Sequence, residues 1–217
     1  MAPASPALTA EPARDCGLCP RLVAYRQENQ ARNPDWWNGP APSFGDPGAR
    51  LLVLGLAPGR TGANRTGRPF TGDHAGVMLF ETLLKTGFAQ GRYDARPDDG
   101  LALVDCMISN AVRCAPPGNR PETPEEAACR PFLTARLAAL PRLEVVVTLG
   151  DVARRNLLRA LGLPASAGVA GHGAEFTAGP YQVINSYHCS RLNTNTGRLT
   201  SEMFEAIFRR ARSLLDG

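Results

Sequence analysis

LLVLGL (residues 51–56) is the stretch that decides the fold of this chain. It is a short apolar run without polar alternation, which is typical of a strand buried on both faces of a parallel sheet. Three further segments predict strands: LALVDCMISNAV (residues 101–112), LEVVVTL (residues 143–149) and YQVINSY (residues 181–187). The sequence therefore predicts a sheet built around these four strands.

Helical patterns separate the predicted strands. The segment TPEE starts one of them, with Pro124 at the first helical position and Glu126 at the capping-box position relative to Thr123. Strands alternating with helices predict an α/β fold with a mostly parallel sheet. We expect one domain over residues 1–217, with residues 1–13 as a frayed tail and residues 169–176 as part of a hairpin. Helices are predicted over residues 19–30, 75–86, 123–140, 151–161 and 200–215.

Composition excludes several classes of protein. The 217 residues are 43% hydrophobic and 20% charged, as in a globular protein and unlike a disordered or fibrous one. No apolar run approaches the roughly 18 residues that a membrane helix needs, and the first residues lack the pattern of a signal peptide, so we expect a cytoplasmic protein without a membrane partner. The net charge of +4 is only a weak sign of nucleic-acid binding. Lys85 is the only lysine, which leaves almost no candidate for a Schiff base.

Three polar or glycine-rich segments follow predicted strands. They are residues 57–73, 113–121 and 188–198. Ligands of parallel α/β sheets bind at the carboxyl ends of the strands, where such segments meet. We therefore expect these three segments to form the functional site together.

The first of these segments belongs to GLAPGRTGANRTGRPFTGD (residues 55–73). Gly62 and Gly67 have the glycine spacing of a phosphate-binding loop, but Arg-Pro follows where that loop needs Lys and Ser or Thr. The alternative is an irregular surface loop. Five glycines that allow close approach of a ligand, the flat ring of Phe70 and the carboxylate of Asp73 favour a functional loop.

YHCSRLNTNTGRL (residues 187–199) places His188 at the end of the last predicted strand. A lone histidine is more often structural, and we interpret His172 in that way. His188 instead precedes many side chains suited to phosphate and sugar contacts, with apolar Leu192 among them. This pattern is typical of a wedge loop that enters a duplex with its apolar residue first.

Four of the six cysteines form a second pattern. Cys16 and Cys19 make a CxxC, and Cys114 and Cys129 flank a proline-rich loop. Four thiolates can hold either zinc or an iron–sulfur cluster, and spacing alone does not separate the two. Four unrelated buried cysteines are the alternative reading.

Taken together, GLAPG…NRTGRPFTGD, VRCAPPGNRP and HCSRLNTNTGRL resemble the motifs of the type-b (family 5) uracil-DNA glycosylases. The resemblance extends from Cys16 to the last helix. It implies a three-layer α/β/α fold with a four-stranded parallel sheet, and a structural [4Fe–4S] cluster on Cys16, Cys19, Cys114 and Cys129. It also implies a prokaryotic, nucleoid-associated monomer that acts on DNA containing uracil or other deaminated bases.

The resemblance assigns roles to individual residues. Catalytic roles fall on Asp73, His188 and Asn119. Base-binding roles fall on Gly55, Ala57, Gly59, Phe70 and Asn110. DNA contacts fall on Ser190, Arg191, Leu192, Asn193, Asn195 and Arg198.

Asn110 departs from the type-b pattern. It stands where type-a enzymes carry an asparagine that reads uracil, whereas type-b enzymes commonly have alanine there. The implied reaction flips the base out of the helix and hydrolyses its N-glycosidic bond, leaving an abasic site. The alternatives are a non-catalytic iron–sulfur DNA-binding protein of the same fold and a nucleotide-binding redox protein, against which the missing phosphate motifs weigh.

Overall fold

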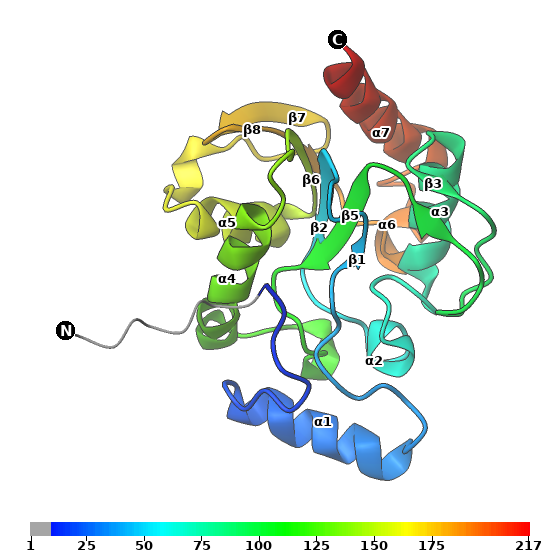
Figure 1. The fold of residues 1–217 in the computed structure, drawn as a ribbon, viewed down its shortest axis with the longest axis vertical. Helices are drawn as coiled ribbons and strands as arrows, with labels where there is room; N and C mark the ends of the chain where they lie inside the picture. The colour runs from blue at the N-terminus through cyan, green and yellow to red at the C-terminus, as the bar shows by residue number, and fades with distance from the viewer. Residues whose placement is uncertain (1–9) are drawn as a thin grey trace.

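The computed structural model describes residues 10–217, and its centre is a six-stranded sheet in the order β1-β5-β2-β6-β8-β7 (Figure 1). The four inner strands are parallel, while both edge strands are antiparallel to their neighbours. The predicted α/β fold with a mostly parallel sheet is confirmed. The predicted number of strands is wrong, because two edge strands extend the parallel centre. The strands of this sheet are β1 (Phe44–Gly45), β2 (Leu51–Gly55), β5 (Cys106–Asn110), β6 (Val145–Leu149), β7 (Ala174–Ala178) and β8 (Tyr181–Ser186).

The unbroken apolar pattern of β2 reflects burial on both faces. Leu51 and Val53 belong to one hydrophobic core, and Leu52 and Leu54 belong to another on the opposite face. All four side chains are fully buried. Burial of this kind contributes about 25 cal/mol per Å² of apolar surface, so both faces of the strand add to stability.

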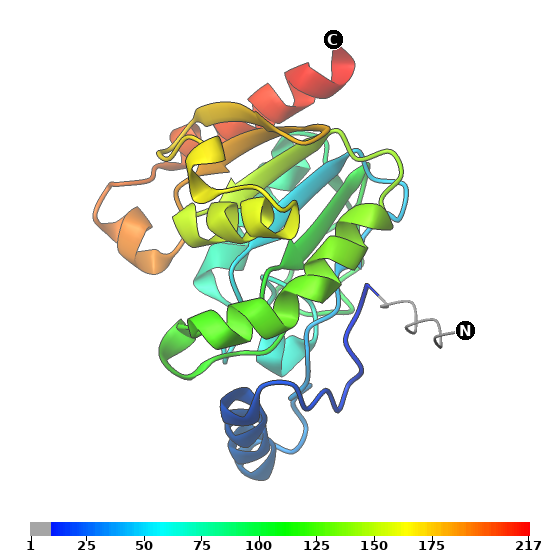
Figure 2. The same ribbon diagram turned by 90° about the vertical axis from the view of Figure 1, so that its left-hand side faces the viewer.

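Helices cover both faces of the sheet and complete three layers (Figure 2). α3 (His74–Lys85) and α7 (Ser201–Asp216) pack on one face, and α4 (Thr123–Ala138) and α5 (Asp151–Ala160) pack on the other. The remaining α-helices are α1 (Pro20–Arg32), α2 (Ala63–Thr66) and α6 (Arg191–Asn195). Short 3₁₀ turns are formed by Pro117–Asn119 and Ala165–Ala167.

The predicted strand over residues 101–112 is broken in two. Its start, β4 (Ala102–Leu103), pairs with β3 (Ala89–Gln90) in a small separate sheet, and only β5 joins the central one. The break falls at Asp105, whose φ of 52° is in the left-handed region. The Asp105 carboxylate accepts hydrogen bonds from the backbone N–H and the guanidinium of Arg50 (2.9 and 2.8 Å), which holds the break in place.

α4 begins at Thr123 as predicted, but its capping box lies one residue earlier than predicted. The capping box is formed by Glu122 and Glu125, not by Thr123 and Glu126. A glutamate replaces the expected hydroxyl because the Glu125 carboxylate also pairs with Arg21 of α1 (2.7 Å). Tertiary contact therefore overrides the local capping preference.

The predicted tail over residues 1–13 falls only partly within the described residues. From residue 10 onward the prediction of fraying is wrong. The guanidinium of Arg113 is buried and donates to the carbonyl oxygen of Ala10 (3.1 Å), and it pairs with Glu11 (3.1 Å). Within residues 10–217 none of the helices has the length and apolarity to span a bilayer.

Candidate active site

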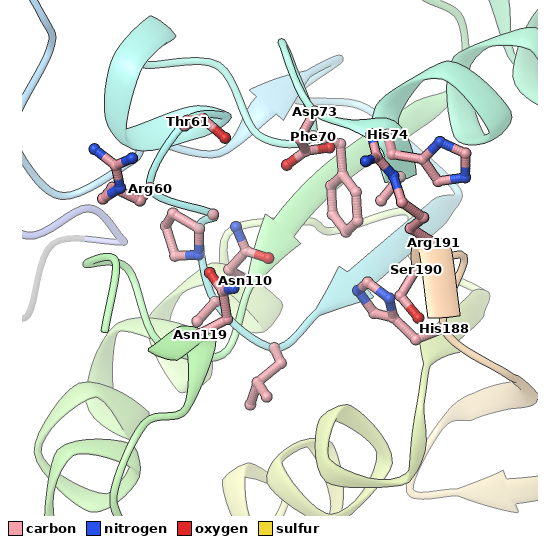
Figure 3. Close-up of a pocket in the computed structure, with 15 residues that line it drawn as sticks. Arg60, Thr61, Phe70, Asp73, His74, Asn110, Asn119, His188, Ser190 and Arg191 are labelled. Carbon is pink, nitrogen blue, oxygen red and sulfur yellow. The ribbon is translucent and has the colours of Figure 1, made fainter. Parts of the chain in front are cut away.

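A cavity of about 580 Å³ opens at the carboxyl ends of β2, β5 and β8 (Figure 3). This is where parallel α/β sheets bind their ligands. All three segments singled out in the sequence contribute to it, so their predicted convergence agrees with the structure. The cavity is lined by Leu56, Ala57, Pro58, Gly59, Arg60, Thr61, Phe70, Asp73, His74, Ala75, Asn110, Asn119, His188, Ser190 and Arg191.

Asp73 is held at the N-terminus of α3. One carboxylate oxygen, Oδ1, accepts a hydrogen bond from the backbone N–H of Gly76 (3.0 Å) and so caps the helix. The other oxygen lies against glycines, since a Cβ would stand 3.1 Å from it at Gly59 and 2.2 Å from it at Gly62. The glycine-rich loop thus makes room for a charged oxygen at the cavity wall.

Phe70 forms the flat side of the cavity. Its backbone has a φ of 55°, and the close approach of its carbonyl oxygen to Gly76 would leave only 1.6 Å to an added Cβ. The ring lies over Gly55, where a Cβ would be 2.7 Å from Phe70 Cζ. Its centroid is 6.2 Å from that of the His188 ring, with an angle of 31° between the planes. The space beside the two rings suits a planar base.

His188 follows β8 and is half-buried beside the cavity. Its carbonyl oxygen accepts a hydrogen bond from Asn193 Nδ2 (2.8 Å), which fixes the backbone of the segment. Burial lowers the pKa of His188, and the charge of Asp73 raises it by a smaller amount. The imidazole is therefore neutral at pH 7 and can donate one N–H to a ligand.

Asn110 ends β5 and its side chain is buried. Its Oδ1 atom has no hydrogen-bond partner among the described residues, although it has no access to solvent. A Cβ on Gly55 would stand 2.5 Å from this oxygen. Figure 3 shows the amide directed into the cavity. A buried acceptor without a partner costs about 1–3 kcal/mol, which a ligand N–H can recover.

Asn119 stands at the rim of the cavity and is exposed. It ends the 3₁₀ turn of the proline-rich segment, and its φ of 56° is a conformation that asparagine adopts more readily than most residues. Its amide is therefore presented to the cavity from the side opposite His188 (Figure 3).

The predicted wedge loop contains a short helix, α6. Ser190 caps it by accepting from the backbone N–H of Asn193 (3.5 Å), and Leu192 is 73% exposed. Ser190 and Arg191 line the cavity, whereas the other predicted DNA contacts lie outside it. Those outside are Leu192, Asn193, Asn195 and Arg198, the last with its guanidinium over the Tyr187 ring.

Three polar residues of the cavity were not singled out in the sequence. Arg60 and Thr61 lie inside the quoted glycine-rich loop, and their position in that loop could have identified them as cavity residues. His74 follows Asp73 directly, and its Nε2 is hydrogen-bonded to Thr194 Oγ1 (2.9 Å). That bond connects α3 with α6 across the edge of the cavity. His172 lies elsewhere and accepts from the backbone N–H of Tyr187 (3.2 Å), which agrees with a structural role.

The four cysteines of the predicted cluster line one small cavity together with the apolar side chains of α1 and α4. Burial is the main cause that raises the pKa of Cys114 to about 12 and that of Cys129 to about 11, the latter in spite of the hydrogen bond and charge of Arg113, which lower it. The backbone N–H of Arg113 donates to Cys129 Sγ (3.3 Å). Across residues 10–217 no group of three or more His, Cys, Asp or Glu is arranged to hold a metal ion.

Residues 42–212 match the family model of the uracil DNA glycosylase superfamily. The chain is 45% identical over 205 residues to the type-5 uracil-DNA glycosylase of Thermus thermophilus, which covers 92% of this chain and 93% of that protein. It is 43% identical to the type-5 enzyme of Pyrobaculum aerophilum, over 91% of this chain and 88% of that protein. The type-4 uracil-DNA glycosylase of Thermotoga maritima is 38% identical over 48% of this chain. The family resemblance seen in the motifs is confirmed: this chain belongs to the uracil-DNA glycosylase superfamily.

Proposed function

We propose that the protein is a DNA-repair glycosylase that releases uracil from DNA by hydrolysis of the N-glycosidic bond. The observation that carries the proposal is one cavity that joins a flat aromatic ring, a buried amide acceptor without a partner, a neutral imidazole and a carboxylate. Such a cavity fits a planar base together with its sugar. The base enters only after it has been flipped out of the helix, as for other enzymes that act on bases.

The side chains divide the reaction between base and sugar. Phe70 stacks on the ring, and Asn110 Oδ1 accepts the N3–H of uracil. In the reaction the bond between C1′ and the base nitrogen breaks, its electron pair leaves with the base, and a water oxygen bonds to C1′. His188 donates a hydrogen bond to a base oxygen, and such a preorganised donor at developing charge is worth roughly 10²–10³ in rate.

Asp73 acts on the sugar side of this reaction. Its carboxylate stabilises the positive charge that develops on the sugar and orients the attacking water, whose proton it accepts. Asn119 holds the same water from the rim of the cavity. Lys85 is the only lysine of the chain and lies at the end of α3 facing Glu205 (4.0 Å), outside the cavity, so the reaction ends at an abasic site.

The wedge residues of α6 contact the DNA. Leu192 fills the space left by the flipped base, while Ser190, Arg191, Asn193, Asn195 and Arg198 contact phosphates and sugars around it. We expect the protein to act as a monomer on the nucleoid in the cytoplasm of a prokaryotic cell. Hypoxanthine, xanthine and cytosine adducts are the further substrates that we expect.

Cys16, Cys19, Cys114 and Cys129 would hold a structural [4Fe–4S] cluster. Within residues 10–217 the four cysteines are not arranged around a single metal ion, but they line one apolar cavity and a backbone N–H is directed at one sulfur, which supports thiolate ligation of a cluster. The cluster would cross-link α1 to α4 and to the segment after β5. It takes no part in the glycosidic reaction, because those residues lie outside the active-site cavity.

The proposed function is tested with the variants Asp73→Asn and Asp73→Ala. Wild-type protein should release uracil from single- and double-stranded oligonucleotides without cleaving the strand. Asparagine caps a helix about as well as aspartate, so Asp73→Asn should keep stability yet lower uracil release by at least about 100-fold. Asp73→Ala should lose the same activity and about 1 kcal/mol of stability as well.

Three results would contradict this proposal. Full uracil release by Asp73→Asn would remove the assigned role of the carboxylate. DNA binding by the wild-type protein without any base release would favour the non-catalytic alternative. A covalent complex trapped with borohydride would overturn the hydrolytic reaction, since it requires an amine nucleophile.

A further inference from the structure

A second cavity, of about 560 Å³, lies beside the candidate active site. It is an open groove lined by the segment between α1 and β1, by α2 and by the loop that joins β3 to β4. Both tryptophans of the chain line it. We call this cavity the tryptophan groove, and its aromatic and charged lining residues are Trp36, Trp37, Arg14, Arg65, Arg96 and Asp35.

The floor of the tryptophan groove is fixed by Trp37. The indole Nε1 donates to the carbonyl oxygen of Pro40 (3.0 Å), and the Arg14 guanidinium lies 3.7 Å from the centroid of the ring. The ring packs so closely on Gly67, whose φ is 79°, that a Cβ there would stand 2.9 Å from it. Trp37 is therefore anchored on several sides and supports the groove.

One wall of the groove is held by a buried ion pair. The Arg68 guanidinium donates to both oxygens of Asp99 (2.8 and 2.7 Å), and this pairing holds the pKa of Asp99 well below its usual range. Asp99 also accepts from the backbone N–H of Asp94 (2.9 Å), which closes the loop around Arg96. The wall is thus formed before any ligand binds.

Trp36 joins the tryptophan groove to the active-site cavity. Its ring is partly exposed, and the guanidinium of Arg60 lies 5.5 Å from its centroid. Arg60 also lines the active-site cavity, at the edge away from His188 (Figure 3). A strand that leaves the active site along Arg60 therefore reaches an open aromatic face next.

The charge of the groove favours a polyanion. Three arginines and one carboxylate, that of Asp35, line the groove, and Arg60 adds a fourth positive charge at the junction with the active site. The positive charge of Arg96 is only weakly neutralised, since its contacts with Asp94 and Asp98 are both 3.8 Å long and all three side chains are exposed. The partly exposed ring of Trp36 lies among these arginines, and aromatic rings combined with positive charge are the features by which proteins bind single-stranded nucleic acid.

We propose that the tryptophan groove binds the unpaired nucleotides that adjoin the target nucleotide in single-stranded DNA. This inference rests on the proposed function for its substrate. Arg65 and Arg96 contact phosphates, and a base stacks on Trp36. In a duplex the neighbouring bases are paired and stacked on one another, so the groove adds affinity only for single strands.

Binding of a uracil-free oligothymidylate tests the proposal, because no turnover occurs. Both tryptophans of the chain lie in the groove, so stacking of a base should quench the intrinsic fluorescence of the wild-type protein in a saturable way. Trp36→Ala should weaken binding by about five-fold or more, and Trp36→Phe should keep most of it. Arg96→Ala should reduce the slope of log affinity against log salt by about 0.7.

Controls separate stacking from charge and from misfolding. Arg209→Ala removes one arginine from α7, at the opposite end of the molecule from α1 and α2 (Figure 1), and should leave binding unchanged. An oligomer of abasic nucleotides keeps the phosphates, so Trp36→Ala should bind it as the wild type does. Thermal unfolding of each variant checks that the fold is kept.

Two outcomes would overturn the inference. The first is that wild type and Trp36→Ala bind oligothymidylate with equal affinity. The second is that Trp36→Ala loses as much affinity for the abasic oligomer as it loses for oligothymidylate. A third outcome, binding with the expected Trp36 dependence but no uracil release by the wild type, would refute the proposed function and support the groove. The two proposals therefore fail separately.

Discussion

Asn110 shows how a single side chain can link stability to substrate choice. Its Oδ1 is buried without a partner among the described residues, and it lies close to the backbone of Gly55, where an added Cβ would stand 2.5 Å from it. An amide oxygen at this place accepts the N3–H of uracil, whereas the unprotonated N3 of cytosine would oppose it. Sites built to hydrogen-bond a substrate group reject analogues that lack it far better than apolar pockets do.

Asn110→Ala should lower uracil release by about 5- to 150-fold, which corresponds to about 1–3 kcal/mol for the lost hydrogen bond. The preference of this variant for uracil over hypoxanthine and bulky cytosine adducts should be smaller than that of the wild type. Stability should change little, because the substitution also removes an acceptor that had no partner. Release rates for uracil and for the competing bases measure the selectivity, and urea unfolding measures the stability. Equal selectivity of the two proteins would mean that Asn110 only ends the strand.

The two histidines with lowered pKa values predict a pH dependence of stability. Burial lowers the pKa of both His188 and His172 in the folded protein, while the unfolded chain titrates near pH 6.5. As the pH falls through 6.5 the unfolded state binds the protons first, so stability is lost toward low pH. His188→Gln and His172→Gln should each reduce the difference in unfolding free energy between pH 7.5 and pH 5. An unchanged difference in His188→Gln would show that this imidazole titrates normally.

At this scale the sequence predicted several residues that line the cavity but not its full outline. Asp73, Phe70 and His188 could be found because each is a lone reactive side chain at the end of a predicted element. Arg60 was not found, because one arginine among many in a loop carries no spacing signal. Only the folded chain brings it beside both Trp36 and the cavity.

At the scale of elements, the carboxyl end of β2 has no space for a side chain beside the cavity. Gly55 is the last residue of this strand, and a Cβ there would stand 2.5 Å from Asn110 Oδ1 and 2.7 Å from Phe70 Cζ. Its backbone is not in the left-handed region, so the requirement for glycine comes from the close approach alone. Glycine is an unfavourable residue for a strand, but here it leaves the space that Asn110 and Phe70 occupy.

Gly55→Ala should displace the Phe70 ring and lower uracil release by more than 10-fold, because small displacements of a bound base cost catalysis heavily. Overpacking typically costs about 1–3 kcal/mol of stability, which urea unfolding would measure. Gly100→Ala is a matched control in an open position, although its positive φ adds strain. Wild-type activity in Gly55→Ala would show that the ring position is not critical.

The element boundaries that the sequence missed have physical causes in the fold. The break at Asp105 depends on Arg50, which is distant in sequence, and the cap of α4 depends on Arg21. The edge strand β1 has only two residues, too few for any pattern to appear. Buried parallel strands carry their own signal, whereas edges and caps are decided by partners elsewhere in the chain.

At the scale of the whole molecule, α1 stands apart from the three layers (Figure 1). It is joined to them by Leu22 in a small apolar cluster, by the Arg21–Glu125 ion pair and by the cysteine cavity. An ion pair that is partly exposed contributes little, about 0–1 kcal/mol. The proposed iron–sulfur cluster would therefore be the main connection of α1 to the rest of the protein.

Replacement of a ligand should accordingly loosen this end of the molecule and spare the sheet. Cys16→Ser should lose the brown colour and the iron of the purified protein, because metal binding at such sites is coupled to folding. Hydrogen exchange should then become faster in α1, while β2 and β6 keep their protection, since their burial does not depend on α1. Cys106→Ala removes a thiol from β5, outside the cysteine cavity, and should keep its iron. Stoichiometric zinc without iron in protein prepared anaerobically, or unchanged exchange in α1 after loss of the iron, would contradict this account of how the molecule is held together.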